Sequence, residues 1–223
     1  MSAAIILAGG RSARMGHDKR RLRLWGPQGP TLLAHTVALA ALVCVEVIVV
    51  LNDPQAWPDL PARLVPDAYP GAGPLGGLAS GLAALAEDRA LLLACDLPLL
   101  QLDLLQAMLA EPLDGDALVP RQLAAQAQAQ AQAQDGSPHG QDVEPLLAIY
   151  RQTCLPTITA CLAHDERRMG AALRQLAVRY LDPAWWMRFD ADGRSFLNLN
   201  RPADLARATQ LTFGNPPPAA ARR

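Results

Sequence analysis

The sequence predicts a single α/β domain in which helices cover both faces of a mostly parallel sheet. Short apolar segments with the composition of buried strands alternate with alanine- and leucine-rich segments of helical composition. Hydrophobic residues make up 51% of the 223 residues, which suffices for one packed core. A glycine pair, Gly9 and Gly10, directly follows the first apolar segment. In open α/β sheets, ligands bind at this position, beyond the carboxyl end of a strand.

The first half of the chain contains the clearest strand and helix patterns. Strands are expected at 3–8, 45–51, 63–65, 90–95 and 117–120, and helices at 31–42, 75–87 and 102–109. Thr31 is the candidate N-cap of the first helix, because a threonine hydroxyl can accept a hydrogen bond from a backbone N–H. Each expected helix lies between two expected strands, which favours parallel strand pairing.

A low-complexity segment interrupts the second half of the chain. Alanine and glutamine alternate over residues 122–134, and a polar stretch follows. Such a composition lacks the apolar side chains that a core requires, so we predict a flexible insertion at about 122–140 within one domain spanning 1–223. Strands are expected again at 146–151 and 178–181, with helical segments to about 176 and from about 202. From about 215 the proline- and alanine-rich chain is expected to be frayed.

Charge and cysteine content exclude several functional classes. The chain has 20 basic and 21 acidic residues, a balance that does not indicate nucleic-acid binding. No apolar stretch reaches membrane-spanning length, and the N-terminus lacks a signal-like pattern, so we expect a cytoplasmic protein without a membrane partner. The expected oligomeric state is a monomer. The four cysteines contain no Cys-x-x-Cys pair and are expected to be free thiols.

The glycine pair begins a cation-rich loop that ends at Lys19, the only lysine of the chain. Glycine lets backbone N–H groups approach phosphate oxygens, and a lysine ammonium is a compact charge that suits polyphosphates. The spacing is not that of a Walker A loop, since Lys19 lies three residues beyond Gly16. We therefore predict a phosphate-binding loop in which Arg14 and Lys19 supply positive charge.

Asp96 ends the fourth expected strand and is the candidate metal ligand. Magnesium prefers one or two carboxylates together with substrate phosphates, and this carboxylate is expected at the same sheet edge as the loop. The alternative is a capping role in the following turn, because Pro98 lies two residues further on. The neighbouring loop favours the Mg²⁺ interpretation.

Four other polar residues lie near the ends of expected strands. Asn52 ends the second strand, and Asp67 follows the third strand, where it could accept a hydrogen bond from a nucleobase or ribose. Asn198 and Asn200 lie two residues apart in an extended segment and therefore share one face. Their amides could contact phosphates, and the alternative is turn formation before a proline.

Taken together in this order, these segments resemble the molybdenum cofactor guanylyltransferase family of nucleotidyltransferases. The resemblance extends from Leu7 to about Leu205. It is carried by 7–16 with Lys19, Asn52, Asp67, 73–77, 96–98, 144–146 and 196–204. Arg201 stands where the family usually has threonine.

The resemblance implies a Rossmann-like single domain and an Mg²⁺-dependent transfer of GMP from GTP to the terminal phosphate of molybdopterin, with release of pyrophosphate. It also implies partner proteins that deliver the cofactor or, as molybdoenzymes, accept the product. The expected GTP-binding residues are Leu7, Ala8, Gly9, Gly10, Lys19, Asn52, Asp67, Gly76, Gly77 and Asp96. The expected catalytic residues are Arg14, Lys19 and Asp96, with Asp96 also the metal ligand and with Asn198 and Asn200 on the cofactor or phosphate side.

The expected reaction agrees with the residues present. The attacking group is already an anionic phosphate, so catalysis requires alignment of two anions and neutralisation of charge on the leaving pyrophosphate. Neither a Ser-His-Asp nor a Cys-His set is visible in the sequence, and this reaction needs neither.

Two classes of alternative remain open. One is another nucleotidyltransferase: a cytidylyltransferase for the same cofactor, or an enzyme acting on a sugar or polyol phosphate. The pair Gly9-Gly10 favours guanine, because cytidylyl relatives tend to have Ala-Gly there. The other class is a non-catalytic nucleotide-binding or cofactor-carrier protein, against which the presence of Lys19 and Asp96 argues.

Overall fold

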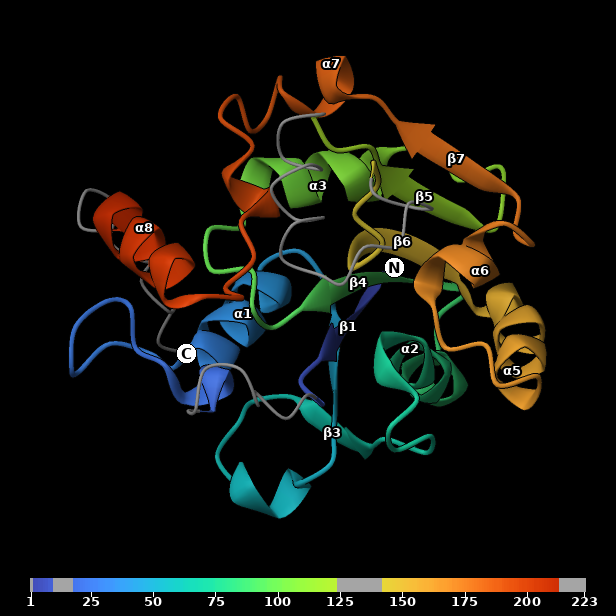
Figure 1. Cartoon of the computed structure of the whole chain (residues 1–223), viewed down its shortest axis with the longest axis horizontal. Helices are drawn as coiled ribbons and strands as arrows, with labels where there is room; N and C mark the ends of the chain where they lie inside the picture. The colour runs from blue at the N-terminus through green and yellow to red at the C-terminus, as the bar shows by residue number, and fades with distance from the viewer. Residues whose placement is uncertain (1, 10–17, 124–141, 213–223) are drawn as a thin grey trace.

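The computed structural model describes residues 2–9, 18–123 and 142–212 (Figure 1). Its strands form one sheet in the order β3-β2-β1-β4-β6-β5-β7. The strands are β1 (Ala3–Leu7), β2 (Glu46–Leu51), β3 (Arg63–Pro66), β4 (Arg89–Ala94), β5 (Ala117–Pro120), β6 (Leu147–Arg151) and β7 (Val178–Leu181). Strands β3, β2, β1 and β4 are mutually parallel, as are β5 and β7, whereas β6 runs antiparallel to β4 and β5. The mostly parallel sheet is confirmed.

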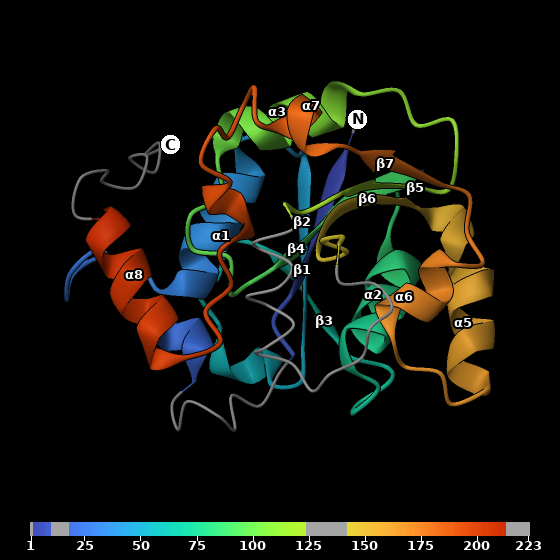
Figure 2. The same cartoon turned by 45° about the horizontal axis from the view of Figure 1, so that its top comes forward.

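Helices cover both faces of this sheet (Figure 2). Helices α1 (Leu32–Ala41) and α3 (Leu102–Ala110) pack on one face, and α2 (Gly73–Ala84), α5 (Leu155–Ala163) and α6 (Met169–Leu173) pack on the other. Side chains of β1 alternate between the two cores: Ala4 and Ile6 pack with α1 and α3, and Ala3 and Ile5 pack with α2. The chain continues through α7 (Pro183–Trp186) to α8 (Pro202–Thr212), where Ala208 belongs to a small buried apolar cluster that includes Leu32 of α1.

Local sequence signals explain where two helices begin. Thr31 caps α1 as predicted, since its Oγ1 accepts from the backbone N–H of Ala34 at 3.2 Å. Helix α2 begins at Gly73, two residues before the predicted start, because Pro74 in the first turn does not interrupt the hydrogen bonds of a helix. It ends at Ala84 rather than at 87, since Leu85 is extended.

Gln122 does not fit the expected boundary of the insertion. The sequence places it in the insertion at 122–140, whereas the structure buries it and shows its backbone N–H donating to the Asp142 carbonyl at 2.7 Å. An isolated bridge between Arg121 and Val143 precedes this contact. The side chain of Gln122 also reaches a buried carboxylate, which composition alone does not reveal. Residues 124–141 lie outside the described part of the chain.

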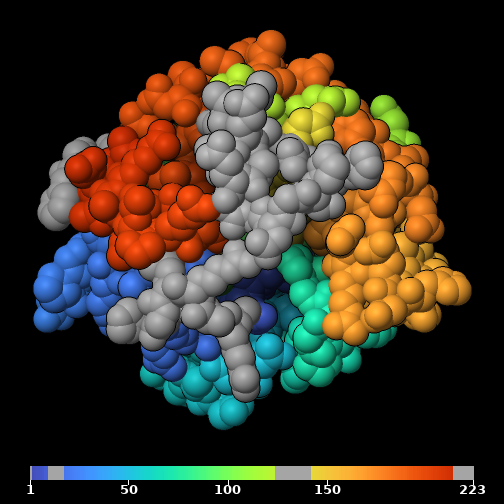
Figure 3. Space-filling view, viewed as in Figure 1, coloured from blue at the N-terminus to red at the C-terminus, as the bar shows by residue number. Residues whose placement is uncertain are grey.

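The parallel strands bring the expected site residues to one edge. Leu7 at the end of β1 pairs with Val50 of β2 and with Ala94 of β4. The residues that follow these three strands, and Asp67 after β3, therefore lie at the same carboxyl edge. Figure 3 shows N-terminal residues in blue, residues from the middle of the chain in teal and green, and C-terminal residues in orange and red on one face of the molecule.

Two further expectations concern the cysteines and the lack of membrane-spanning helices. All four cysteines are free thiols, as expected. Within the described ranges, no helix has both the length and the apolar character needed to cross a membrane.

The close approach of α2 to β1 generates a stability prediction. A Cβ at Gly81 would lie 2.5 Å from Cγ2 of the fully buried Ile5. We expect Gly81→Ala to lower the free energy of unfolding by about 1–3 kcal/mol through overpacking, measured by urea denaturation. Helix propensity alone would instead raise stability by up to about 1 kcal/mol, so a stabilised variant would contradict this account. In the Ile5→Ala background, where the crowding atoms are removed, Gly81→Ala should lower the free energy of unfolding by less than it does in the wild type.

Candidate functional site

A cavity of about 270 Å³ opens at the carboxyl ends of β1, β2 and β4. Six of the expected nucleotide-binding residues line it: Leu7, Gly9, Lys19, Asp67, Gly77 and Asp96. The other lining residues are Arg20, Val50, Gly73, Pro74, Ala94, Cys95 and Leu146. The cavity therefore forms where the sequence predicted nucleotide binding.

Lys19 brings together groups that are far apart in the sequence. It begins the short 3-10 helix η1 (Lys19–Arg21), which the side chain of Asp18 caps. The Lys19 Nζ lies 3.2 Å from Asn200 Oδ1 and 3.5 Å from Asp96 Oδ2. The Lys19 side chain is 16% exposed and that of Asp96 is 25% exposed, so this ion pair is partly shielded from solvent. An ammonium held at the edge of a cavity is suited to attract a phosphate.

Asp96 lies two residues beyond β4 and is hydrogen-bonded to the segment that carries the asparagines. Its backbone carbonyl accepts from the Leu199 N–H at 3.0 Å. Burial raises the pKa of the Asp96 carboxyl, and the nearby Lys19 ammonium opposes this rise. The described ranges contain no cluster of three or more His, Cys, Asp or Glu side chains that could hold a metal. A single carboxylate fits Mg²⁺ when substrate phosphates complete the coordination.

Gly9, Asn52 and Asp67 converge beside the cavity. A Cβ at Gly9 would lie 3.5 Å from Asn52 Nδ2 and 3.9 Å from Asp67 Oδ2. Asp67 Oδ1 accepts from the Tyr69 N–H at 2.9 Å and lies 3.1 Å from Ser80 Oγ, which fixes the carboxylate. Ser80 was not predicted as a site residue, because only the packing of α2 brings its hydroxyl to Asp67. Glycine at position 9 keeps the space beside Asn52 and Asp67 open.

The remaining expected residues near α2 and β1 differ in their contacts. Gly77 lines the cavity, where a Cβ would lie 3.0 Å from Leu7 Cδ2. Gly76 is not among the lining residues, and a Cβ there would lie 2.8 Å from the Cβ of Ala72. Ala8 is buried, and its N–H donates to the Val50 carbonyl at 2.9 Å. The geometry thus explains Gly76 and Ala8 by packing and strand alignment.

Asn198 contacts a buried acid that sequence reasoning did not single out for a role. Its Nδ2 donates to Glu144 Oε2 at 3.3 Å, and Gln122 Nε2 donates to the same oxygen at 2.8 Å. Glu144 is 4% exposed, and this burial raises the pKa of its carboxyl to about 7. Asn198 and Asn200 therefore have different partners: a buried acid and the Lys19 ammonium.

Two expected residues, Gly10 and Arg14, lie outside the described residues. Gly16, which contributed to the loop spacing, lies there as well.

Comparison with known proteins links this site to one family. Residues 4–180 match the family described as MobA-like NTP transferase domain. The chain is 47% identical over 207 residues to a probable molybdenum cofactor guanylyltransferase of Chloroflexus aggregans, with 92% of each chain covered. It is 32% identical over 205 residues to a molybdenum cofactor guanylyltransferase of Syntrophotalea carbinolica, with 91% of this chain and 88% of that relative covered.

Solved structures confirm the fold. Molybdopterin-guanine dinucleotide biosynthesis protein A of Archaeoglobus fulgidus has a TM-score of 0.76 at 23% identity, with 95% of this chain and 99% of that chain covered. A 2-C-methyl-D-erythritol 4-phosphate cytidylyltransferase of Thermus thermophilus has a TM-score of 0.62 at 19% identity, with 96% and 100% covered.

The buried Glu144 generates a pH prediction. The folded protein keeps this proton up to about pH 7, whereas the unfolded chain releases it near 4.5. The stability that goes with a protonated, buried Glu144 is therefore fully present below pH 4.5 and is lost as the pH rises through 7. Between pH 4.5 and 8, the wild type should lose roughly 3 kcal/mol of unfolding free energy relative to Glu144→Gln, measured by chemical denaturation. Parallel pH profiles of the two proteins would contradict the burial of an ionisable acid.

Proposed function

The chain belongs to the MobA-like NTP transferase family, and from this premise we propose that it transfers GMP from GTP to the terminal phosphate of the molybdenum cofactor, releasing pyrophosphate. The observation that carries the proposal is the Lys19 ammonium, which lies 3.5 Å from the Asp96 carboxylate at the cavity beyond β1 and β4. The names of relatives that are 47% and 32% identical support guanylyl transfer.

The proposed binding roles follow the two sides of the cavity. Gly9, Asn52 and Asp67 would contact the guanine or the ribose, since their polar groups converge there. Lys19 and Asp96 would serve the phosphates, with Gly10 and Arg14 in the loop that precedes Lys19. Leu7 and Gly77 would contact GTP from the cavity lining. Ala8 and Gly76 would contribute to the GTP-binding site through backbone packing. Asn198 and Asn200 would face the acceptor phosphate.

The proposed reaction is a substitution at the α-phosphorus of GTP. An oxygen of the acceptor phosphate forms a bond to this phosphorus, the bond to the bridging oxygen of the β-phosphate breaks, and pyrophosphate leaves with that electron pair. The attacking oxygen is already anionic, so no strong general base is needed. The Lys19 ammonium would neutralise negative charge that develops on the phosphates.

Asp96 is the residue that would hold Mg²⁺. When bound, Mg²⁺ supplies neutralisation of phosphate charge. Orientation of the nucleotide would come from Lys19 and from the converging group of Gly9, Asn52 and Asp67. We further propose that the single domain acts in the cytoplasm as a monomer, and that proteins delivering the cofactor or accepting the product are its partners.

The first test compares pyrophosphate release from GTP, CTP and ATP with Mg²⁺ and a molybdopterin-loaded acceptor. We expect turnover with GTP, and a loss of about 100- to 1,000-fold in Lys19→Ala because a charge on the phosphates is removed. Arg63→Ala removes an exposed cation at the opposite end of the sheet and should match the wild type. Preference for CTP would identify a cytidylyltransferase, and no turnover despite an active acceptor would favour a nucleotide-binding protein.

A second test addresses the metal. Asp96→Asn retains the size of the side chain but removes its charge, so the Mg²⁺ concentration for half-maximal turnover should rise by about tenfold or more. Calorimetric titration of Mg²⁺ into the GTP complex should show the same weakening. Asp103→Asn removes an exposed carboxylate of α3 and is the matched control. Unchanged Mg²⁺ affinity in Asp96→Asn would exclude Asp96 as the ligand.

A further inference from the structure

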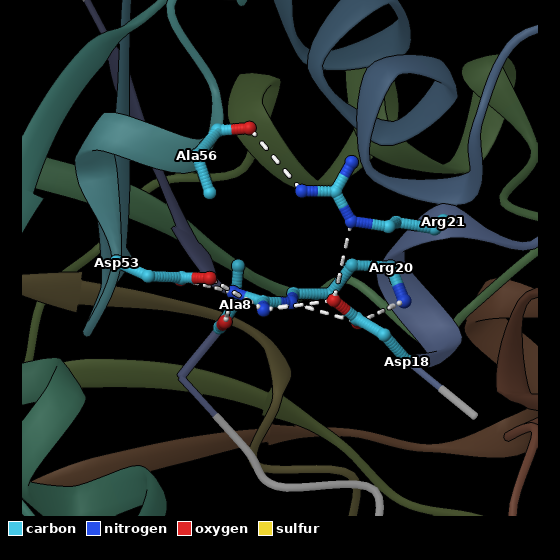
Figure 4. A network of polar contacts seen from close by, with 6 residues as sticks. All are labelled: Ala8, Asp18, Arg20, Arg21, Asp53 and Ala56. Carbon is cyan, nitrogen blue, oxygen red and sulfur yellow. Dashed lines mark hydrogen bonds and ion pairs between the residues drawn. The ribbon is translucent and has the colours of Figure 1, made fainter. Parts of the chain in front are cut away.

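Arg20, which follows Lys19, uses every N–H of its guanidinium in hydrogen bonds (Figure 4). Its Nε and Nη2 donate to the two carboxylate oxygens of Asp18, both at 2.9 Å. Its Nη1 and Nη2 donate to the two oxygens of Asp53, at 2.5 Å and 2.9 Å. The second N–H of Nη1 donates to the Ala8 carbonyl at 3.2 Å. A guanidinium has five N–H donors, so these contacts satisfy all of them.

The positions of these acceptors show what Arg20 holds together. Ala8 directly follows β1 and precedes Gly9, the first residue of the glycine-rich segment 9–17. Asp18 caps η1 and stands where that segment ends. Asp53 lies two residues beyond β2 and begins the turn into η2 (Pro54–Ala56). Arg20 therefore joins the two ends of the glycine-rich segment to each other and to the end of β2.

Three of the residues in this network are chain neighbours of proposed nucleotide contacts. Ala8 precedes Gly9, and Arg20 follows Lys19. Asp53 follows Asn52, whose side-chain amide lies beside Gly9. A rigid connection among the network residues would fix the spacing between the phosphate side and the nucleoside side.

The electrostatics exclude a second role for Arg20 as a phosphate ligand. Two carboxylates face its single positive charge, and the side chain is only 14% exposed. Hydrogen bonds to Asp53 and Asp18 raise the pKa of Arg20 further, which keeps it charged. The Arg20 Cζ also lies 5.4 Å from the centroid of the Trp57 ring. The guanidinium thus has acceptors on every edge, although it lines the cavity.

We propose that Arg20 is a positioning residue: its fork-shaped contacts with Ala8, Asp18 and Asp53 set the distance between Lys19 and Asn52 that a bound nucleotide requires. This inference rests on the proposed nucleotide site but not on the identity of the acceptor. Lysine cannot replace Arg20, because an ammonium has no planar fork for two carboxylates.

The experiment measures the Kd of Mg²⁺-GTP by calorimetry, without an acceptor, at a temperature well below the unfolding midpoint of each variant. Arg20→Lys retains the positive charge. Asp53→Asn retains the shape of the side chain but replaces one of the two oxygens that accept from Arg20. Arg23→Lys is the matched control, since exposed Arg23 donates to the Gly29 carbonyl and lies outside the network. The double variant Arg20→Lys/Asp53→Asn tests whether the two residues act through one network.

We expect Arg20→Lys to raise the Kd about 10- to 100-fold and Asp53→Asn at least about threefold, with Arg23→Lys at the wild-type value. The double variant should bind no more weakly than Arg20→Lys, because the same network is already lost. A purely structural role would lower the unfolding midpoint and leave the Kd of the folded variants unchanged, which would overturn the proposal. Tighter binding by Asp53→Asn would also overturn it, since it would show a released Arg20 contacting phosphate.

This result is separable from the proposed function. Wild type that binds GTP but transfers nothing would refute guanylyl transfer and leave the Kd comparison intact. Wild type that transfers GMP while Arg20→Lys binds GTP normally would refute the positioning role alone.

Discussion

The parallel alignment of β1, β2 and β4 is the constraint on which the site depends. Because Leu7 pairs with both Val50 and Ala94, the chain leaves three neighbouring strands at one sheet edge. The residues that follow these strands cannot then separate without breaking buried strand pairing. The hydrogen bonds and apolar side chains of the sheet hold the strand ends together, and the polar contacts of Arg20 act on the residues that follow these ends.

Two cations with different surroundings meet at this edge. Arg20 is enclosed by two carboxylates and a carbonyl, and the Lys19 ammonium lies 3.5 Å from the Asp96 carboxylate and 3.2 Å from the Asn200 amide oxygen. The fork geometry of arginine suits a fixed connection, and the compact ammonium of lysine suits a charge that must adapt to an incoming phosphate. The use of a single lysine in a chain with 20 basic residues agrees with this division.

The sequence predicted the elements well because their signals are local. Apolar runs identified β1, β2 and β4, and Thr31 identified the start of α1. Residues at the carboxyl ends of strands could also be assigned to one edge, since parallel pairing alone brings them together.

The contacts that could not be predicted join segments distant in sequence. Asn198 reaches Glu144 across 54 positions, and Arg20 reaches Asp53 across 33. The antiparallel orientation of β6 and the burial of Gln122 likewise depend on how the chain returns after the interruption. No periodicity or spacing encodes such contacts, because side-chain packing decides them.

The central claim is that the Lys19 ammonium contacts the phosphates of the bound nucleotide. Since Lys19 is the only lysine, selective ¹⁵N labelling of lysine side chains gives one ammonium signal in an NMR spectrum. Titration with Mg²⁺-GTP should shift this signal in a saturable manner, and guanosine without phosphates should shift it far less. A signal that does not move at saturating GTP would contradict the account.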